Sequence, residues 1–383
     1  MSTGNAKAEA SEEVTLYKPT GRVTVPGKPI NPGQLPAQAL DLFGSVLTNS
    51  VEDVKNFSNV FVMWEQIPKY AAGNMLKEGH VPNDFSLPFN IAHQEAKITL
   101  LPGTFYEKGV PMRRYPGTKE QSVEQALIRI SRSQNEEQTV NGYTSYFVTF
   151  TINALRRELA QTNNTMSHVQ IRQSLDVLSS TVMTISYGDG GKRDNRDTII
   201  SSFDRNNMSA DGGNGDDLWR IKLHPLIVQS IMQVNYRQYP VDKMKHYSPV
   251  GSQLLRRIFF IMTNVSLDNP YTFTVDELKR IIAGLNHVRI SGSMIVIQKE
   301  LERMITDNYL DRYVMDDIYP IKRGRGRPVP IDYRFTLYPG PEWIKNMKAG
   351  SKLQSIAEQR LGLARSKRPE REAQMLLGFE ATN

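Results

Sequence analysis

Residues 271–315 read YTFTVDELKRIIAGLNHVRISGSMIVIQKELERMITDNYLDRYVM, and most of the fold prediction depends on them. Thr274 is followed by Glu277 in the capping-box position, which predicts the start of a helix. After a turn with Gly284, apolar residues recur at helical spacing and predict a second helix. The elements expected in and around this stretch are, in order, helix Ser248–Met262, strand Tyr271–Phe273, helix Thr274–Ala283, helix Ser291–Asp307, strand Tyr309–Met315 and strand Asp332–Leu337.

The same order of elements is expected earlier in the chain. There, Ser167 is a candidate N-cap, and a stretch of alternating aromatic and β-branched residues predicts a strand. Helix, strand, helix, helix and a two-stranded wing is the order of a winged-helix domain, although small domains that bind no DNA share this pattern. We therefore expect an α+β fold with two tandem winged-helix domains. The elements of the first copy are helix Thr118–Ser133, strand Tyr143–Phe150, helices Ile152–Gln161 and Ser167–Ser180, strand Thr181–Tyr187, a turn over residues 188–195 and strand Thr198–Phe203.

The composition of the two ends sets the expected domain limits. Residues 1 to about 36 contain five prolines and few large apolar residues, so they cannot bury enough surface to offset the chain entropy. We expect a disordered arm over residues 1–54. Residues 55–240 are expected to form the first winged-helix domain, for dimerisation and DNA binding, and residues 241–340 the second. Residues 341–383 are expected to be a basic helical tail.

The positive charge of the chain is concentrated at its end. The 383 residues carry a net charge of +7. Residues 321–383 hold 13 Lys plus Arg and 6 Asp plus Glu, a net +7, so the first 320 residues, with 34 of each, sum to zero. This distribution is typical of a surface that binds a polyanion, and a solvated basic tail is the alternative. No stretch is apolar enough to suggest a membrane span.

The predicted wing of the second domain reads KRGRGRP over residues 322–328. Glycines let a backbone approach a narrow groove, and arginines beside them can insert into the minor groove of A·T-rich DNA. The RGRP core resembles an AT-hook. The basic residues expected to contact DNA here are Lys322, Arg323, Arg325 and Arg327.

The second helix of each predicted helix pair is a candidate for reading DNA. Polar residues at its start or off its apolar stripe could reach base edges or phosphates, although exposed polar faces are more often only solvated. In the second domain these residues are Arg289, Ser291, Ser293, Gln298, Lys299 and Arg303. In the first domain they are Ser167, His168, Gln170, Arg172 and Gln173, together with the wing residues Lys192, Arg193 and Arg196.

The sequence carries no enzymatic signature that we can identify. It has no cysteine, which excludes disulfides, thiol nucleophiles and cysteine-ligated metals. The six histidines include no pair at metal-ligand spacing, and GDGGKR over residues 188–193 lacks the spacing of a phosphate-binding loop. We therefore expect a non-enzymatic protein without a metal site or cofactor.

A short apolar segment lies near the N-terminal arm. Gln38, Leu40, Asp41, Leu42 and Phe43 resemble the peptide by which bacterial replication proteins bind the sliding clamp, although Ala39 stands at the glutamine position of the strict motif. Apolar anchors on an unstructured peptide can fill a partner's pocket. The alternative is that these residues pack on the body of the protein.

Several longer stretches resemble plasmid replication initiator proteins of the theta-replicating, iteron-binding type. The stretches, which span roughly residues 55–340, are WEQIPKY at 64–70, VEQALIRI at 123–130, YFVTFTINALRREL at 146–159, IRQSLDVLSS at 171–180 and YSPVGSQLLRRIFF at 247–260. The resemblance implies a cytoplasmic, plasmid-associated bacterial protein that binds direct repeats of double-stranded DNA at an origin and promotes opening of an adjacent A·T-rich segment. It also implies recruitment of the host replicative helicase and initiator, and a homodimer in equilibrium with the monomer.

Two other classes of protein fit the same DNA-binding elements. One is a two-domain winged-helix transcriptional regulator, which needs no contact with helicase or clamp. The other is an architectural protein that binds DNA without sequence preference.

Overall fold

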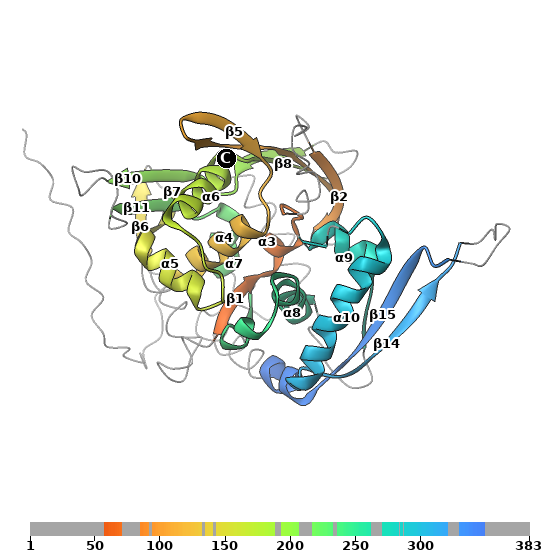
Figure 1. Cartoon of the computed structure of the whole chain (residues 1–383). Coiled ribbons are helices and arrows are strands. Elements are labelled where there is room, and N and C mark those ends of the chain that lie inside the picture. The colour runs from red at the N-terminus through yellow and green to blue at the C-terminus, as the bar shows by residue number, and fades with distance from the viewer. Residues whose placement is uncertain are drawn as a thin grey trace, which may run out of the picture.

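The computed structural model describes residues 57–70, 85–91, 94–131, 135–140, 143–187, 193–206, 217–232, 236–261, 270–282, 284–285, 287–320 and 329–348. Helices and strands alternate along the chain in an α+β fold (Figure 1). The buried hydrophobic residues form two clusters, one from Phe61 to Tyr236 and the other from Tyr239 to Met347. We call the elements β1 to β12 the first unit, and the elements from η4 to the helix over residues 341–348 the second unit. No helix in the described part of the chain is long and apolar enough to span a membrane.

The first unit contains two four-stranded sheets, and its helices α4, α5 and α6 also contribute residues to the core. The sheet orders are β2-β3-β8-β9 and β10-β11-β7-β6, with antiparallel neighbours. The elements are β1 (Phe57–Phe61), α3 (Val62–Gln66), β2 (Phe85–Ile91), β3 (Gln94–Leu101), β4 (Gly103–Glu107), β5 (Val110–Arg114), α4 (Thr118–Ile130), β6 (Asn135–Val140), β7 (Tyr143–Thr151), α5 (Ile152–Ala160), α6 (His168–Ser180), β8 (Val182–Tyr187), β9 (Arg193–Thr198), β10 (Ser202–Asn206), β11 (Leu218–Lys222), α7 (Pro225–Met232) and β12 (Tyr236–Pro240).

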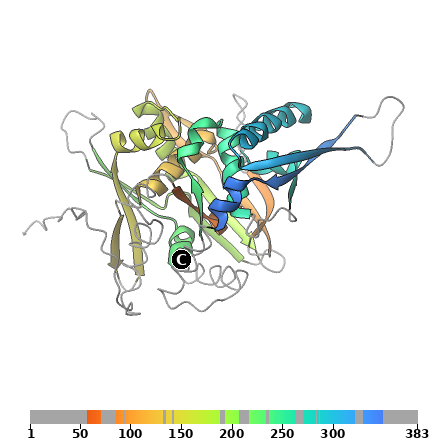
Figure 2. The same ribbon diagram turned by 90° about the horizontal axis from the view of Figure 1, so that it is seen from below.

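The second unit follows the order helix, strand, helix, helix and two-stranded ribbon that its sequence predicts. Its three strands form one antiparallel sheet in the order β13-β15-β14. Strands β14 and β15 continue outward as a long ribbon that projects from the body beside α10 (Figures 1 and 2). The elements are η4 (Asp242–His246), α8 (Pro249–Ile261), β13 (Tyr271–Thr274), α9 (Val275–Ile281), α10 (Ile290–Thr306), β14 (Leu310–Ile318) and β15 (Asp332–Pro339), followed by the helix over residues 341–348.

Side-chain caps fix the helix starts that the sequence predicts. The Ser167 hydroxyl accepts a hydrogen bond from the Gln170 backbone N–H (3.2 Å), and the Gln170 side chain accepts one from the Ser167 N–H (3.0 Å). Thr274 caps α9 by accepting a hydrogen bond from the Glu277 N–H (3.2 Å). Each cap satisfies a backbone donor that the first helical turn leaves free, which confirms these two predictions.

Helix α4 begins at Thr118, as expected, and the Glu120 carboxylate caps it by accepting a hydrogen bond from the Gly117 N–H (2.8 Å). Two other local expectations are corrected. The turn expected over residues 188–195 is shorter, since β9 pairs with β8 from Arg193 onward. Residues 341–348, assigned to the tail, form a helix that belongs to the second cluster, because Trp343 is 1% exposed and Met347 is 6% exposed.

The two copies of the element order differ in how their strands pair. In the second unit, β13 precedes the helix pair and joins the same sheet as the ribbon β14–β15. In the first unit, the corresponding strand β7 pairs with β6 and β11, whereas β8 and β9 join β3 in another sheet. The first unit is therefore not a simple copy of the second.

Candidate nucleic-acid interface

Helix α10 lies on the surface of the second unit with one side in the core. Its buried residues include Ile297, Leu301 and Met304, which recur at helical spacing. The opposite side carries the exposed residues Ile295 and Lys299. Residues four apart in a helix share a face, so this outer side is a straight ridge. The exposed residues of the ridge are Ile295, Lys299, Glu302 and Thr306.

The segment before α10 is held in place from two sides. The Lys279 ammonium donates a hydrogen bond to the backbone carbonyl of His287 (3.0 Å). The His287 ring lies against Gly292 so closely that a Cβ at that position would come within 2.9 Å of the ring's Cγ atom. Glycine at position 292 therefore lets the ring pack on the first turn. The next two residues, Val288 and Arg289, are exposed.

Some of the residues of α10 that were predicted to read DNA are accessible, whereas others are held by neighbouring side chains. Arg289 and Lys299 are exposed and Ser291 is half-buried, so these residues are available to a ligand. Two others are engaged: the Gln298 amide donates a hydrogen bond to Met315 Sδ on β14 (3.5 Å), and Arg303 pairs with the buried Glu300 (3.1 Å).

Ser293 is a corrected prediction. The residue is completely buried, because it lies one turn before Ile297 on the side of α10 that faces the core. A side chain in this position cannot reach DNA while the helix is packed. It therefore does not belong to the candidate interface.

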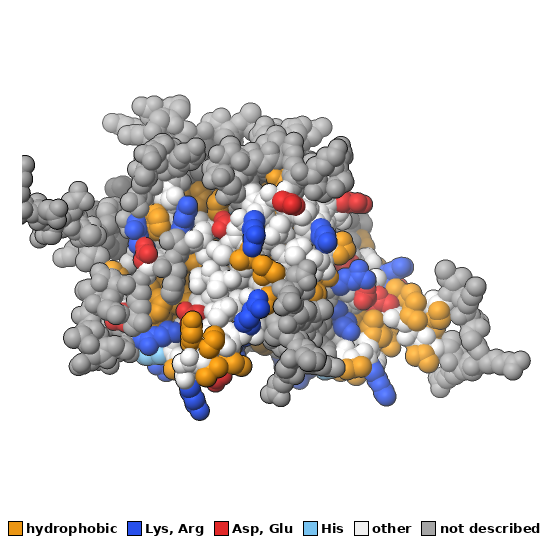
Figure 3. Space-filling model, turned by 90° about the horizontal axis from the view of Figure 1, so that it is seen from above, with side chains coloured by type: hydrophobic (Ala, Val, Ile, Leu, Met, Phe, Trp, Pro, Cys, Tyr) orange, Lys and Arg blue, Asp and Glu red, His pale blue; other side chains and the backbone are white. Residues whose placement is uncertain are grey.

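The ribbon β14–β15 carries few positive charges along its described length. The strands pair without interruption from Arg312 and Tyr338 to Ile318 and Asp332. The segment with Lys322, Arg323, Arg325 and Arg327 lies outside the described residues. Hydrophobic side chains gather on the projecting ribbon (Figure 3), and those that are exposed are Val314, Tyr319, Val329 and Ile331.

The acidic residues of the ribbon limit how it can approach DNA. Asp316 and Asp317 are exposed on β14, and Asp332 begins β15. Carboxylates repel phosphates at short range. The described part of the ribbon is therefore poorly suited to follow a DNA backbone, whereas residues 321–328, which join its strands in the sequence, include four basic residues and no acidic one.

In the first unit, α6 is open only near its N-terminus. Ser167 is exposed, whereas the other predicted reading residues are half-buried. Strand β4 packs on the C-terminal half of the helix, where the Ser180 hydroxyl accepts a hydrogen bond from the Thr104 N–H (2.7 Å). A Cβ at Gly103 would lie 2.4 Å from the Val177 carbonyl oxygen, so the contact is tight. The half-buried residues are His168, Gln170, Arg172 and Gln173.

Two of the three basic residues predicted for the wing of the first unit lie in β9. Arg196 is exposed in this strand, and Arg193 is its first residue. Lys192 lies outside the described residues, as do the clamp-like residues Gln38, Leu40, Asp41, Leu42 and Phe43.

A network of buried charges joins the two units. Arg256 of α8 donates a hydrogen bond to Glu65 of α3. Next to this pair, the Lys69 ammonium donates to the Trp64 carbonyl (2.8 Å), and the Trp64 indole donates to Glu124 (2.6 Å). Burial lowers the pKa of Lys69 and raises the pKa of Glu124, while the attraction between the two side chains, 4.0 Å apart, opposes both effects.

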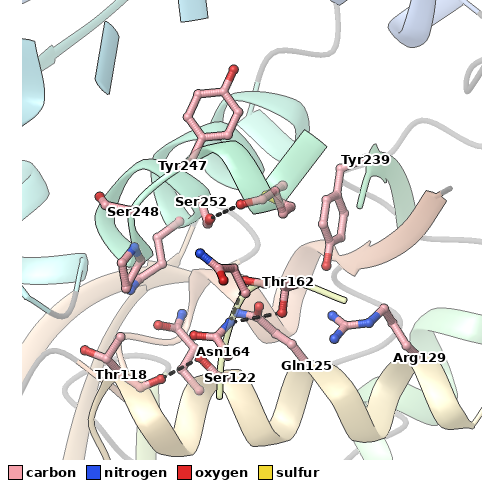
Figure 4. Close-up of a pocket in the computed structure, with 15 residues that line it drawn as sticks. Thr118, Ser122, Gln125, Arg129, Thr162, Asn164, Tyr239, Tyr247, Ser248 and Ser252 are labelled. Carbon is pink, nitrogen blue, oxygen red and sulfur yellow. Dashed lines mark hydrogen bonds between the residues drawn. The ribbon is translucent and has the colours of Figure 1, made fainter. Parts of the chain in front are cut away.

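A polar cavity of about 140 Å³ lies at the same junction (Figure 4). One wall is α4, with Ser122, Gln125 and Arg129, and the opposite wall is formed by Tyr247, at the end of η4, and by α8. The Arg129 guanidinium is held by the Glu158 carboxylate (2.5 Å). The junction therefore brings together hydroxyl, amide and charged groups, whereas each unit has an apolar core.

Comparisons with known proteins give a weak structural likeness. No protein-family model matches the chain, and no curated protein sequence matches it. It is similar to two crystal structures of RctB domains 2 and 3, one of them a selenomethionine derivative, each at 13% sequence identity. These similarities cover 72% of this chain and 99% and 100% of the RctB chains, with TM-scores of 0.42 and 0.43.

The sequence prediction did not include two exposed apolar residues next to its candidate readers. Val288 is 98% exposed and Ile295 is 60% exposed. Ile295 could have been recognised, because it lies two positions from the buried Ile297 and so falls about 200° away from it around the helix. Helical spacing could not have predicted the exposure of Val288, because this residue precedes the helix.

Proposed function

We propose that this chain is a non-enzymatic, sequence-specific DNA-binding protein that initiates plasmid replication. The observation that carries the proposal is the combination of an exposed α10 ridge with a projecting ribbon. In the sequence its two strands are joined by a segment that reads KRGRGRP over residues 322–328, called the ribbon tip below. A helix of this size fits the major groove, and a glycine-spaced basic tip fits the adjacent minor groove.

In this proposal the two units act as tandem winged-helix domains, with limits near residues 55–240 and 241–340. Helix α10 and the ribbon tip read one part of a direct repeat, and the N-terminal end of α6 with Arg196 reads another. Binding to several repeats promotes opening of an adjacent A·T-rich segment, and the bound protein then recruits the host helicase and initiator. The sliding clamp is a further partner through Leu40, Leu42 and Phe43, and dimerisation through the first unit limits the amount of active monomer.

Three features of the chain support this proposal. The excess positive charge lies at and beyond the ribbon tip, where it would anchor the protein on phosphates regardless of sequence. Arg289, directly before α10, and Lys299, in the middle of the helix, are exposed and could reach phosphates or base edges. We propose a role in replication rather than in transcription because the longer sequence stretches resemble theta-type initiators.

Footprinting on the DNA that flanks the gene of this protein tests the proposal. We expect protection of several direct repeats at helical-turn spacing, next to an A·T-rich tract that becomes reactive to a single-strand probe when protein is added. Protection of a single palindrome without opening would instead indicate a transcriptional regulator. Uniform protection without a preferred site would indicate an architectural protein.

A further inference from the structure

The outer ridge of α10 contains an aliphatic residue where a solvated helix usually carries a polar one. Ile295 points directly away from the core, on the side opposite Ile297, and is 60% exposed. A β-branched residue at an exposed helical position also has a lower helix propensity than Lys, Glu or Ala. Neither packing nor helix formation therefore explains this side chain.

Val288 lies two residues before the start of α10, next to a residue that is held in place from two sides. Its neighbour His287 is fixed by the Lys279 hydrogen bond on one side and by contact with Gly292 on the other. Val288 is consequently held outside the core and is 98% exposed. Its side chain makes no contribution to the core and is accessible to a ligand.

The residues around these two side chains fit DNA as the ligand. Arg289 follows Val288 directly, and Lys299 lies one turn beyond Ile295 on the ridge. Glu302 lies a further turn along, so a negative charge limits the favourable surface to the N-terminal half of the helix. Val288 and Ile295 are single aliphatic side chains and are too small a patch for a typical protein interface. The two side chains instead fit a ligand whose surface is mostly polar and carries isolated methyl groups.

The only apolar group on a base edge in the major groove is the 5-methyl group of thymine. We propose, on the basis of the function proposed above, that Val288 and Ile295 contact thymine methyl groups and thereby help to select the sequence that this protein binds. Arg289 and Lys299 then position the helix on the neighbouring phosphates. The binding site accordingly contains at least two thymines whose methyl groups face α10.

Replacement of thymine by deoxyuridine tests this inference, because it removes the methyl group and leaves base pairing unchanged. The preferred site is first selected from random duplexes with the full chain, and each thymine is then replaced singly. We expect about fourfold weaker binding for each contacted methyl, measured as a Kd by fluorescence anisotropy. Ile295→Ala should abolish the discrimination at one thymine, and Val288→Ala should abolish it at another.

Val110→Ala is the matched control, because Val110 is 57% exposed on the hairpin β4–β5 of the first unit. This variant should discriminate thymine from uracil as the wild type does. The inference is overturned if the wild type binds both bases equally at every position, or if both α10 variants keep the full discrimination. If the selection yields no preferred site at all, the proposed function fails as well, so the two failures are distinguishable.

Discussion

Arg256 of α8 and Glu65 of α3 form a mostly buried ion pair that joins the two units across 191 positions of sequence. Burial, the largest single influence, would lower the pKa of the Arg256 guanidinium, but the charge and hydrogen bond of Glu65 together with Tyr239 and Glu124 outweigh it and raise the pKa. A charge that loses its partner in such a place cannot be solvated by bulk water. The pair therefore makes the junction sensitive to single substitutions.

Glu65→Ala should lower the free energy of unfolding by about 3–5 kcal/mol, because it leaves Arg256 buried without its partner. The double variant with Arg256→Met should recover part of this loss, since no uncompensated charge remains. Asp276→Ala, which removes an exposed pair with Arg280, is the control and should cost less than about 1 kcal/mol. Urea denaturation measures all three. Equal losses for Glu65→Ala and Asp276→Ala would show that the buried pair is unimportant.

His224 should make the protein less stable in acid. Burial, with smaller contributions from Lys69 and Lys222, lowers the pKa of this imidazole from 6.5 to about 3. Between these values the unfolded chain binds more protons than the folded one, so the free energy of unfolding falls as the pH is lowered through this window. The slope should reach about 1.4 kcal/mol per pH unit.

His224→Asn tests this pH dependence. In the wild type, the ring Nδ1 atom accepts a hydrogen bond from the Leu226 N–H (3.2 Å), and the asparagine carbonyl oxygen can take over this role without titrating. The variant should be less stable near neutrality but should lose less stability on acidification. Parallel stability curves for the two proteins between pH 6.5 and pH 4 would contradict the assignment.

The elements with local signals were predictable from the sequence. Caps such as Ser167 with Gln170, and Thr274 with Glu277, act within one helical turn, so the sequence alone is enough to find them. The strand pair β1–β12 was not predictable. It joins residues 57–61 to residues 236–240, and no local pattern specifies a partner so far along the chain.

The candidate site was predictable to a smaller extent. Charged residues such as Arg289 and Lys299 were expected at the surface and are exposed there. Ser293 was assigned to the wrong face, because polarity outweighed its spacing from Ile297. Composition alone also does not show that Ile295 points outward, because its neighbours Met294, Val296 and Ile297 are apolar as well.

Two substitutions at Ser167 separate its capping role from a role in DNA binding. Ser167→Ala removes the cap of α6 and should cost about 1 kcal/mol of stability with little effect on DNA affinity. Ser167→Asp keeps a capping oxygen but adds a negative charge at an exposed helix start. If this end of α6 lies near phosphates, the aspartate should weaken DNA binding about fivefold at low salt, without loss of stability. Thermal denaturation and anisotropy titrations measure the two effects. Unchanged affinity of Ser167→Asp would exclude this end of α6 from the interface.

The ribbon tip should determine much of the salt dependence of DNA binding. Each phosphate contact contributes about 0.9 to the slope of log Kobs against log salt, so Arg325→Ala with Arg327→Ala should lower the magnitude of the slope by about 1.8. Arg312→Ala is the control. Its side chain points away from α10, because Tyr313 and Met315 on the other face of β14 pack against the core. This variant should leave the slope unchanged.

A conservative double variant tests whether the same arginines enter the minor groove. Arg325→Lys with Arg327→Lys retains both charges, so the salt slope should stay close to that of the wild type. Lysine cannot replace the planar guanidinium in a narrow, A·T-rich minor groove, so affinity for sites flanked by A·T tracts should fall more than affinity for sites flanked by G·C. Titrations of both duplexes at several salt concentrations give the two readouts together. If Arg325→Ala with Arg327→Ala kept the wild-type salt slope, the ribbon tip would not lie on DNA, and its positive charge would need another explanation.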